Sequence, residues 1–146
     1  MSCKMERELI QKLIRIAKDH RKMSYAPYSN FNVSAALLTE SGNIYKGINF
    51  ENAAYSPSIC AERSAASAAV NAGDRKFTAI AIVGGPSYST DNYCPPCGVC
   101  RQVLREFADP QEMVVILAKS VTDYREYTLE QLLPESFGPE NLEITV

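Results

Sequence analysis

Two short stretches of the chain constrain its structure most, because they must meet in space for either to function. They are Cys60-Ala61-Glu62 and Pro96-Cys97-Gly98-Val99-Cys100. Their three thiols follow a C…CxxC pattern, and three sulfur ligands leave the fourth corner of a tetrahedral zinc site open for water. Glu62 lies two residues from the first thiol and is free to move a proton. We therefore expect a catalytic zinc site held by Cys60, Cys97 and Cys100.

A further thiol, Cys94, leaves two alternatives open. Cys94-Pro95-Pro96-Cys97 is a second CxxC that overlaps the first. If Cys94 joined the other three sulfurs, the site would be closed, and the chain would be a structural four-cysteine zinc module without catalysis. If Cys94 and Cys97 formed a redox pair, Cys60, Glu62 and Cys100 would have no role. The open site explains more of these residues than either alternative.

Composition limits the fold and the partners. We expect a single domain over residues 1–146, because this length supports one sizeable core. Fifteen basic and 17 acidic residues give a net charge of -2, which offers no footprint for a nucleic-acid backbone and favours a small neutral substrate. No stretch is apolar enough to span a membrane or to act as a signal peptide. We therefore expect a cytoplasmic protein, whose five cysteines serve metal binding or catalysis.

The hydrophobic pattern predicts alternating helices and strands. Apolar residues at helical spacing predict helices, and short apolar runs bounded by turn residues predict strands. The order predicts an α/β domain with a mixed sheet of about five strands. The expected helices cover about 5–22, 60–73, 97–109 and 129–133, and the expected strands 33–38, 44–49, 77–85, 113–117 and 124–128.

Polar residues near the two motifs suggest supporting roles. Arg63 lies three residues after Cys60 on the same helical face, so it can donate to a ligand sulfur; the alternative is a surface arginine. Asn49 and Glu51 follow a strand and could bind a ligand or cap a turn. His20, the one histidine, lies among charged residues at a helix end, where we expect it to be solvated.

Five collinear motifs make a family resemblance specific. Together they resemble the short, homotetrameric cytidine deaminases of pyrimidine salvage, over nearly the whole chain, and zinc nucleobase deaminases share the Glu…Pro-Cys-x-x-Cys signature. The resemblance implies a three-layer α/β/α sandwich. The motifs are Tyr25-Ala26-Pro27-Tyr28-Ser29-Asn30-Phe31, Gly47-Ile48-Asn49-Phe50-Glu51-Asn52-Ala53, Cys60-Ala61-Glu62-Arg63, Pro96-Cys97-Gly98-Val99-Cys100-Arg101-Gln102 and Leu132-Leu133-Pro134-Glu135-Ser136-Phe137-Gly138-Pro139.

The resemblance also implies an activity and a role for each matching residue. The activity is hydrolytic deamination of cytidine and 2′-deoxycytidine to uridine and 2′-deoxyuridine, in which zinc hydroxide attacks C4 and Glu62 shuttles the proton. One zinc per subunit would be held by the three thiols, with Arg63 neutralising their charge. Substrate contacts would come from Phe31 and Ala61 (base), Asn49 and Glu51 (ribose 3′-hydroxyl), and Ala53, Tyr55 and Phe137 in a neighbouring subunit's pocket.

Two positions depart from the family pattern. Ser34 stands where the family commonly has glycine, and Cys94 precedes Pro95 where a serine is more usual. Blasticidin-type deaminases share the zinc motifs but lack the Asn-x-Glu-Asn-Ala segment, so this segment favours a nucleoside with a free ribose. A deaminase that edits nucleic acid is the weaker alternative, because the chain lacks a basic surface and the extra loops.

Overall fold

A five-stranded mixed sheet forms the centre of the molecule. The structure is a computed structural model that describes residues 5–146. The strand order is β2-β1-β3-β4-β5, and the neighbouring strands are antiparallel except for the parallel pair β3 and β4. The predicted mixed sheet is therefore confirmed. Its strands are β1 (Phe31–Thr39), β2 (Ile44–Ile48), β3 (Phe77–Pro86), β4 (Val114–Ala118) and β5 (Tyr124–Thr128).

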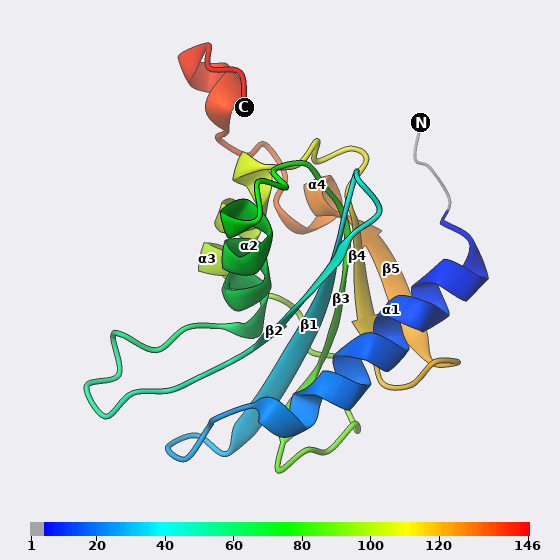
Figure 1. Cartoon of the computed structure of the whole chain (residues 1–146), viewed down its shortest axis with the longest axis vertical. Coiled ribbons are helices and arrows are strands. Elements are labelled where there is room, and N and C mark those ends of the chain that lie inside the picture. Colours follow the sequence, from blue (N-terminus) through cyan, green and yellow to red (C-terminus); the bar gives the residue numbers. More distant parts are fainter. Residues whose placement is uncertain (1–4) are drawn as a thin grey trace.

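Helices cover both faces of the sheet, which gives three layers (Figure 1). α1 (Arg7–His20) packs on one face, and α2 (Ala61–Asn71), α3 (Gly98–Glu106) and the short α4 (Leu129–Leu132) pack on the other. Two short 3-10 helices, Arg21–Met23 and Pro139–Leu142, complete the described elements. None of the described helices is long and apolar enough to cross a membrane.

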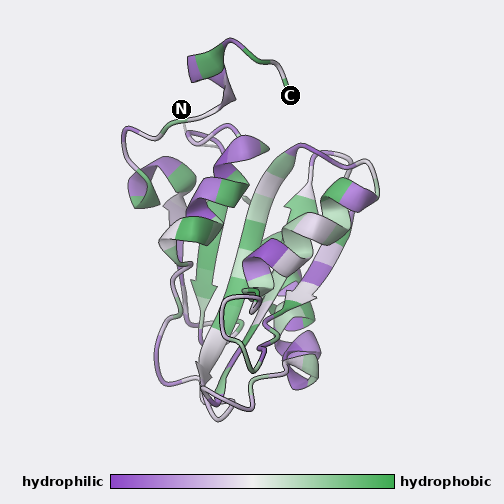
Figure 2. Cartoon of the chain, turned by 90° about the vertical axis from the view of Figure 1, so that its left-hand side faces the viewer, coloured by the Kyte–Doolittle hydropathy of each residue, from purple (hydrophilic) through white to green (hydrophobic). Residues whose placement is uncertain are grey.

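The central strands are apolar on both faces because helices cover both. Along β3, Ile80 and Ile82 belong to the core under α2 and α3, while Ala79, Ala81 and Val83 belong to the core under α1. Side chains of a strand alternate between faces, so a strand with two buried faces has a continuous hydrophobic run. Figure 2 shows this continuous hydrophobic colour along the central strands, whereas the helices alternate between hydrophobic and hydrophilic residues.

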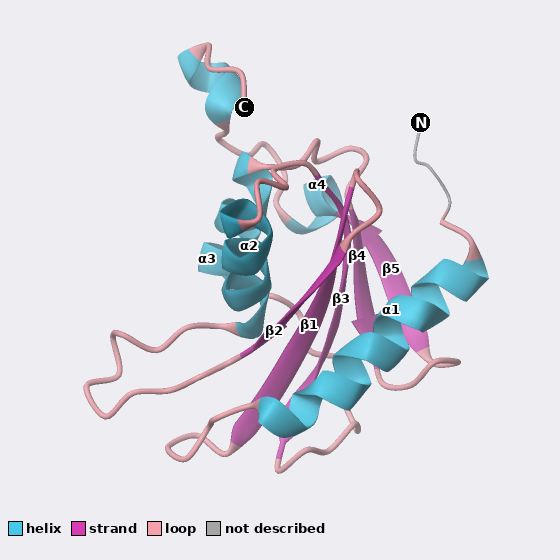
Figure 3. Ribbon diagram, viewed as in Figure 1, coloured by secondary structure: helices cyan, strands magenta, loops and turns pink. Residues whose placement is uncertain are grey.

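The strand directions bring several loops to one edge of the sheet. β1 is antiparallel to both β2 and β3, so β2 and β3 run in the same direction, and Ile48 and Val83 flank Ser34 on either side. The carboxyl ends of β2 and β3 and the start of β1 at Phe31 therefore share one edge. Figure 3 shows the loops before β1, between β2 and α2, and between β3 and α3 gathered there.

The helix α2 lies very close to β2 because both elements present small residues at their contact. A Cβ atom added to Gly47 would lie 2.3 Å from the carbonyl oxygen of Ala61 and 2.4 Å from the backbone nitrogen of Ala65. Ala61, Ala65 and Ala69 are fully buried, as the small-residue run of this helix predicts. This close approach fixes the position of the N-terminus of α2 against the sheet.

The third helix ends earlier than the sequence pattern indicates. A helix was expected over 97–109, but α3 ends at Glu106. Phe107 leaves the helical conformation, with φ -115°, and its carbonyl accepts a 2.8 Å hydrogen bond from the backbone N–H of Phe77. This long-range bond to the start of β3 outweighs continuation of the helix. The apolar spacing of this helix would also turn Val99 inward, but Val99 is 58% exposed in the first turn.

The C-terminal tail has a packing role that its sequence did not indicate. The guanidinium of Arg105 donates to both carboxylate oxygens of Glu140 and to the hydroxyl of Ser136, and its side chain is only 8% exposed. A Cβ atom at Gly138 would lie 2.4 Å from the guanidinium carbon of Arg105. The sequence alone would assign Phe137-Gly138-Pro139 to a turn without a core role. That expectation is wrong, because α3 holds this segment.

The glycine at the contact between α2 and β2 gives a first prediction. Gly47→Ala would force the two elements apart, because the new methyl group meets backbone atoms that cannot rotate away. Overpacking of this kind costs about 1–3 kcal/mol, which urea unfolding should show as a lower midpoint. Gly98→Ala is the matched control, since its Cβ meets nothing within 4 Å and should leave the midpoint unchanged or higher. Equal midpoints for the two variants would contradict the packing argument.

Asp74, just after α2, gives a prediction about pH. Its carboxylate oxygen accepts hydrogen bonds from Ser41 Oγ (2.7 Å), Asn43 Nδ2 (3.1 Å) and Tyr45 Oη (2.8 Å), which joins α2 to the β1–β2 hairpin. These bonds, led by that of Ser41, lower the pKa of Asp74 to about 2. Because the pKa is depressed in the folded state, the stabilisation is present above about pH 4 and is lost as the pH falls toward 2.

Asp74→Asn should therefore lower the melting temperature at pH 7, and the difference from the unmodified chain should narrow between pH 4 and pH 2. Thermal unfolding of both proteins in the same buffers at each pH measures this difference. A melting-temperature difference that stays constant down to pH 2 would show that the charge of Asp74 does not contribute to the stability of the fold.

Candidate active site

Three of the cysteines lie together at the starts of two helices. Cys60 is the N-cap of α2, Cys97 is the N-cap of α3, and Cys100 lies in the first turn of α3. The Sγ atoms of Cys60 and Cys97 are 3.8 Å apart, those of Cys97 and Cys100 are 3.4 Å apart, and all three lie within 4.8 Å of one another. Residues 37 positions apart in the sequence thus form one cluster of sulfur atoms.

The sulfur cluster has the dimensions and the environment of a zinc site. Zinc–sulfur bonds of about 2.3 Å at tetrahedral angles place ligand sulfurs about 3.8 Å apart, close to the observed spacing. Both helix N-termini carry free N–H groups and a positive dipole end, which favour thiolates. The backbone N–H of Cys100 points to Cys97 Sγ at 3.5 Å. The three thiols therefore fit a zinc ion by number, spacing and charge.

Cys94 lies outside the metal-binding group. It is buried in the core under α2 and α3, and a Cβ atom at Gly84 would lie 2.8 Å from its Sγ. Burial raises the pKa of the Cys94 thiol to about 12, so it stays protonated at neutral pH. The four cysteines of residues 5–146 are all free thiols. Neither the four-sulfur site nor the redox pair is therefore favoured.

Arg63 extends from the first turn of α2 to the sulfur cluster. Its Nη2 atom lies 3.5 Å from Cys60 Sγ, while its Nε atom is buried without a hydrogen-bond partner in the described residues. A hydrogen bond from the Cys100 thiol, together with those from Arg63 and Cys97, lowers the pKa of Cys60 to about 5 despite its burial. The same pairing, with Cys100 as the donor, raises the pKa of Cys100. The site therefore already holds a thiolate at neutral pH.

Glu62 is a buried carboxyl group beside the cluster. Only 4% of the residue is exposed, and burial, with a smaller contribution from the negative charge of Cys60, raises its pKa to about 7. Arg63 opposes this shift. A carboxyl group with a pKa near the working pH can both accept and donate a proton. The environment of Glu62 is therefore suited to general acid–base chemistry.

Asn49 and Glu51 lie where β2 ends, and both tie loops together. Glu51 Oε1 accepts hydrogen bonds from the backbone N–H groups of Tyr28 and Ser29, each 3.0 Å long, and Oε2 accepts from the Ser29 hydroxyl. Asn49 Oδ1 accepts from the backbone N–H of Val33 at 3.0 Å. Glu51 thus caps the loop before β1, and Asn49 binds the start of β1, at the same edge as the sulfur cluster.

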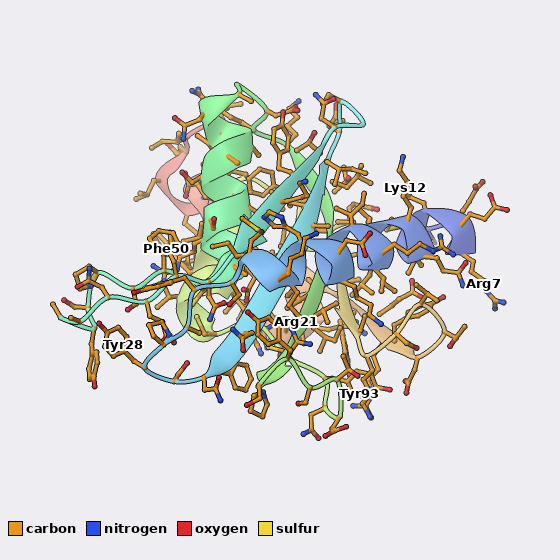
Figure 4. The ribbon with its side chains drawn as sticks, turned by 60° about the horizontal axis from the view of Figure 1, so that its bottom comes forward. Arg7, Lys12, Arg21, Tyr28, Phe50 and Tyr93 are labelled. Carbon is orange, nitrogen blue, oxygen red and sulfur yellow. The ribbon has the colours of Figure 1, made fainter. Side chains whose placement is uncertain are left out.

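The remaining predicted contact residues lie on the loops and on the tail. Phe31, at the start of β1, is 40% exposed, and Ala61 is buried in the first turn of α2. Ala53 and Tyr55 are exposed in the β2–α2 loop, where the Tyr55 ring packs edge-on against Tyr28 with centroids 5.9 Å apart. Phe137 is 58% exposed on the tail held by α3. Figure 4 shows Tyr28 and Phe50 on neighbouring loops of this edge.

Sequence reasoning missed a residue that holds the second cysteine motif. Arg101 Nε donates to the carbonyl of Pro96 at 2.7 Å, and its Nη1 donates to the carbonyl of Leu132 at 2.6 Å. It thereby joins the residue before Cys97 to the end of α4. Arg101 stood within a quoted motif, but nothing in its spacing indicated these two carbonyl partners.

A groove of about 780 Å³ lies at the opposite edge of the sheet. Its lining includes Leu38 at the end of β1, Phe77 at the start of β3, Val114 at the start of β4, and Val146 of the tail. None of the predicted site residues lines it. The groove is therefore separate from the sulfur cluster.

Comparison with known families identifies the family to which this chain, with its three-layer fold, three clustered thiols and buried carboxyl group, belongs. Residues 7–117 match the family model for the cytidine and deoxycytidylate deaminase zinc-binding region. This span contains the three thiols, Glu62 and Arg63. The chain belongs to the cytidine and deoxycytidylate deaminase family, which confirms the resemblance to cytidine deaminases predicted from the motifs.

Individual relatives match the chain over nearly its whole length. The cytidine deaminase of Sporosarcina psychrophila is 46% identical over 91% of this chain and 94% of its own. That of Halalkalibacterium halodurans is 42% identical over 90% of this chain and 96% of its own. The crystal structure of cytidine deaminase from Burkholderia pseudomallei superposes with a TM-score of 0.78 at 44% identity, covering 86% of this chain and 97% of that one.

The position of Cys94 gives a prediction about metal content. Cys94→Ser should keep about one zinc per chain, because its thiol lies outside the group of three sulfurs, whereas Cys100→Ser should lose most of the metal. Atomic absorption or a colorimetric zinc assay on the purified proteins measures both. Circular dichroism serves as the folding control. Zinc loss in Cys94→Ser with the fold intact would favour a four-sulfur site.

Proposed function

We propose that this chain catalyses the zinc-dependent hydrolytic deamination of cytidine and 2′-deoxycytidine to uridine and 2′-deoxyuridine. One water is consumed and one ammonia is released. The observation that carries the proposal is the placement of a buried, protonatable Glu62 beside a cluster of three sulfurs. Family membership and the names of the relatives support the choice of reaction.

Cys60, Cys97 and Cys100 are the proposed zinc ligands. Bound zinc supplies a Lewis acid that makes a water molecule acidic enough to act as a nucleophile at neutral pH. Arg63 offsets part of the negative charge of the thiolates through its contact with Cys60. The two helix N-termini offset more of it.

Glu62 is the proposed proton carrier. It takes the two protons of the attacking water in turn, delivering the first to the ring nitrogen of the pyrimidine and the second, from the hydroxyl added at C4, to the departing amine. The raised pKa supports both directions of transfer, because the protonated and ionised forms are both accessible near pH 7. Burial keeps bulk water away from the carboxyl group, so its proton remains available to the substrate.

The loops at the sheet edge supply the proposed substrate contacts. The ring of Phe31 packs against the base, and the backbone N–H of Ala61, which lies in the first turn of α2 where amides have no helical acceptor, binds the base carbonyl. Asn49 and Glu51 bind the ribose 3′-hydroxyl. Their internal hydrogen bonds support this role, because those bonds hold both polar groups in place before a ligand arrives.

The proposal includes a homotetramer with shared active sites, in which Ala53, Tyr55 and Phe137 complete a neighbouring subunit's pocket. The exposure of Tyr55 and Phe137 supports it, since large exposed aromatic side chains often mark interfaces. We also propose that residues 1–146 act as one catalytic domain in the cytoplasm. The continuous sheet supports the first statement, and the free thiols support a reducing compartment.

The role of Glu62 gives a prediction about rate. Glu62→Gln should keep zinc and bind cytidine, but its kcat should fall at least by the factor of about 10²–10⁴ that is typical of a positioned acid or base. An ultraviolet assay with cytidine measures the rate, and a zinc assay checks the metal. Glu126→Gln is the matched control, because Glu126 is an exposed carboxylate on β5, and this variant should keep full activity. Near-full turnover by Glu62→Gln would exclude the proposed role.

The same assay distinguishes the substrate classes. Cytidine and 2′-deoxycytidine should be converted, whereas cytosine, CMP and a cytosine-containing oligonucleotide should not. Preferred turnover of the oligonucleotide would favour a nucleic-acid-editing enzyme instead.

A further inference from the structure

The side chain of Asn49 has only one hydrogen-bonding group left for a ligand. An asparagine amide offers two N–H donors and two acceptor sites on its oxygen. Asn49 Oδ1 accepts from the backbone N–H of Val33 (3.0 Å) and from the hydroxyl of Ser24 (2.5 Å), which uses both acceptor sites. Its Nδ2 donates to the carbonyl of Phe31 at 2.7 Å. A single N–H remains, so Asn49 can act toward a ligand only as a donor.

The backbone fixes the orientation of this amide and of its neighbours. Because the N–H of Val33 can only donate, the atom of Asn49 that faces it must be the oxygen. The Ser24 hydroxyl must then give its proton to Asn49, and its own oxygen accepts from Asn32 Nδ2 at 3.2 Å. The donor at Val33 therefore determines the donor and the acceptor in each of the next two bonds, between Ser24 and Asn49 and between Asn32 and Ser24.

This ordered chain of hydrogen bonds leaves an unpaired buried atom at its far end. Asn32 is only 4% exposed, and its Oδ1 atom has no hydrogen-bond partner in the part of the chain that the structure describes. Leaving a buried carbonyl unpaired is energetically unfavourable, because its bond to water is lost and not replaced. Reversing the Asn32 amide would pair the oxygen with Ser24 but would take the Ser24 proton away from Asn49. The arrangement that orients Asn49 is therefore the one in which Asn32 Oδ1 is left without a partner.

Arg21 holds the backbone beneath this chain of bonds. Its Nε donates to the carbonyl of Asn32 at 2.9 Å, and its two Nη atoms donate to the carbonyls of Gly85, Tyr88 and Ser89. The side chain is buried and lies where the end of α1 meets β1 and the loop after β3 (Figure 4). Arg21 thus ties the backbone at Asn32 to the loop after β3.

Glu51 complements Asn49. Its carboxylate already accepts from Tyr28, Ser29 and the Ser29 hydroxyl, which leaves an acceptor site on Oε2. One donor on Asn49 and one acceptor on Glu51 match a group that both accepts and donates, which is the pattern of a hydroxyl. A hydrogen atom in place of that hydroxyl would leave both groups unpaired.

We propose that Ser24 and Asn32 are positioning residues that hold Asn49 as a donor and thereby set the preference for nucleosides that carry a 3′-hydroxyl. The inference rests on the proposed function, in which Asn49 binds that hydroxyl. Neither residue touches the substrate, so both act through the orientation of the Asn49 amide.

The test compares two substrates that differ only in the 3′-hydroxyl, 2′-deoxycytidine and 2′,3′-dideoxycytidine. Ser24→Ala should lower kcat/KM for 2′-deoxycytidine by about 3- to 10-fold, the effect of one neutral hydrogen bond, and should change that for 2′,3′-dideoxycytidine less than twofold. A purely structural role would lower both values by the same factor. That result would overturn the inference.

Ser34→Ala is the matched control. Ser34 is a fully buried serine of β1 whose hydroxyl donates to the carbonyl of Ala17 in α1 and makes no bond to Ser24 or Asn49. Its loss should lower the melting temperature without changing the ratio of the two kcat/KM values. A change of that ratio in Ser34→Ala as large as in Ser24→Ala would also overturn the inference.

Asn32→Asp tests the direction of the bonds. A carboxylate oxygen in place of Nδ2 would draw the Ser24 proton toward itself, so Asn32→Asp should reduce the preference for 2′-deoxycytidine at least as much as Ser24→Ala does. In the double variant that combines Ser24→Ala with Asn32→Asp, the second change should add no further loss of preference, because alanine at position 24 has no hydroxyl proton to redirect. A loss in the double variant equal to the sum of the two single losses would contradict a connection through Ser24.

Asn49→Ala separates this inference from the proposed function. If the parent protein does not deaminate cytidine, the proposed function fails, and the inference fails with it. If it does, and Asn49→Ala keeps the preference for the 3′-hydroxyl, the ribose contact and the inference are both wrong. If Asn49→Ala loses the preference and Ser24→Ala keeps it, only the inference is wrong.

Discussion

The shared direction of β2 and β3 is the constraint on which the site depends. Because both strands run antiparallel to β1, their carboxyl ends lie at the same edge of the sheet, and the helices that follow them begin there. The cysteines at the two helix starts therefore meet, although they are far apart in the sequence. The contact of α2 with Gly47 then sets the height of Cys60 above the sheet. Reversal of either strand would separate the sulfur atoms.

Electrostatic balance is the second requirement of this arrangement. Three sulfurs and a carboxyl group share a small volume, in which Cys100 and Glu62 are buried, and this concentrates negative charge. Arg63 and two helix N-termini supply the opposite charge. Burial meanwhile favours the protonated form of Glu62, so the site combines a thiolate with a carboxyl group that titrates near neutrality. Cys94 precedes the proposed ligand Cys97 closely in the sequence, but its thiol remains protonated because it is buried among apolar side chains.

Several parts of the fold were predictable because they depend on local patterns. The apolar residues of α1 recur at helical spacing, and Leu13 and Ile14 are fully buried as that spacing predicts. The end of α3 and the role of the tail were not predictable. Phe107 leaves the helix to pair with Phe77, and Arg105 binds Glu140, contacts that join residues 30 and 35 positions apart. Local periodicity carries no information about such partners.

The sequence by itself determined the chemistry of the candidate site, because the spacing of the thiols and the acid in two short motifs limits what those groups can do. Tertiary structure alone decided which groups take part. It placed Cys94 in the core and outside the sulfur group, and it connected Ser24 and Asn32 to Asn49. The physical reason is that metal ligation and hydrogen bonding depend on distances of a few ångströms. Those distances are set by the direction and packing of strands far apart in the chain.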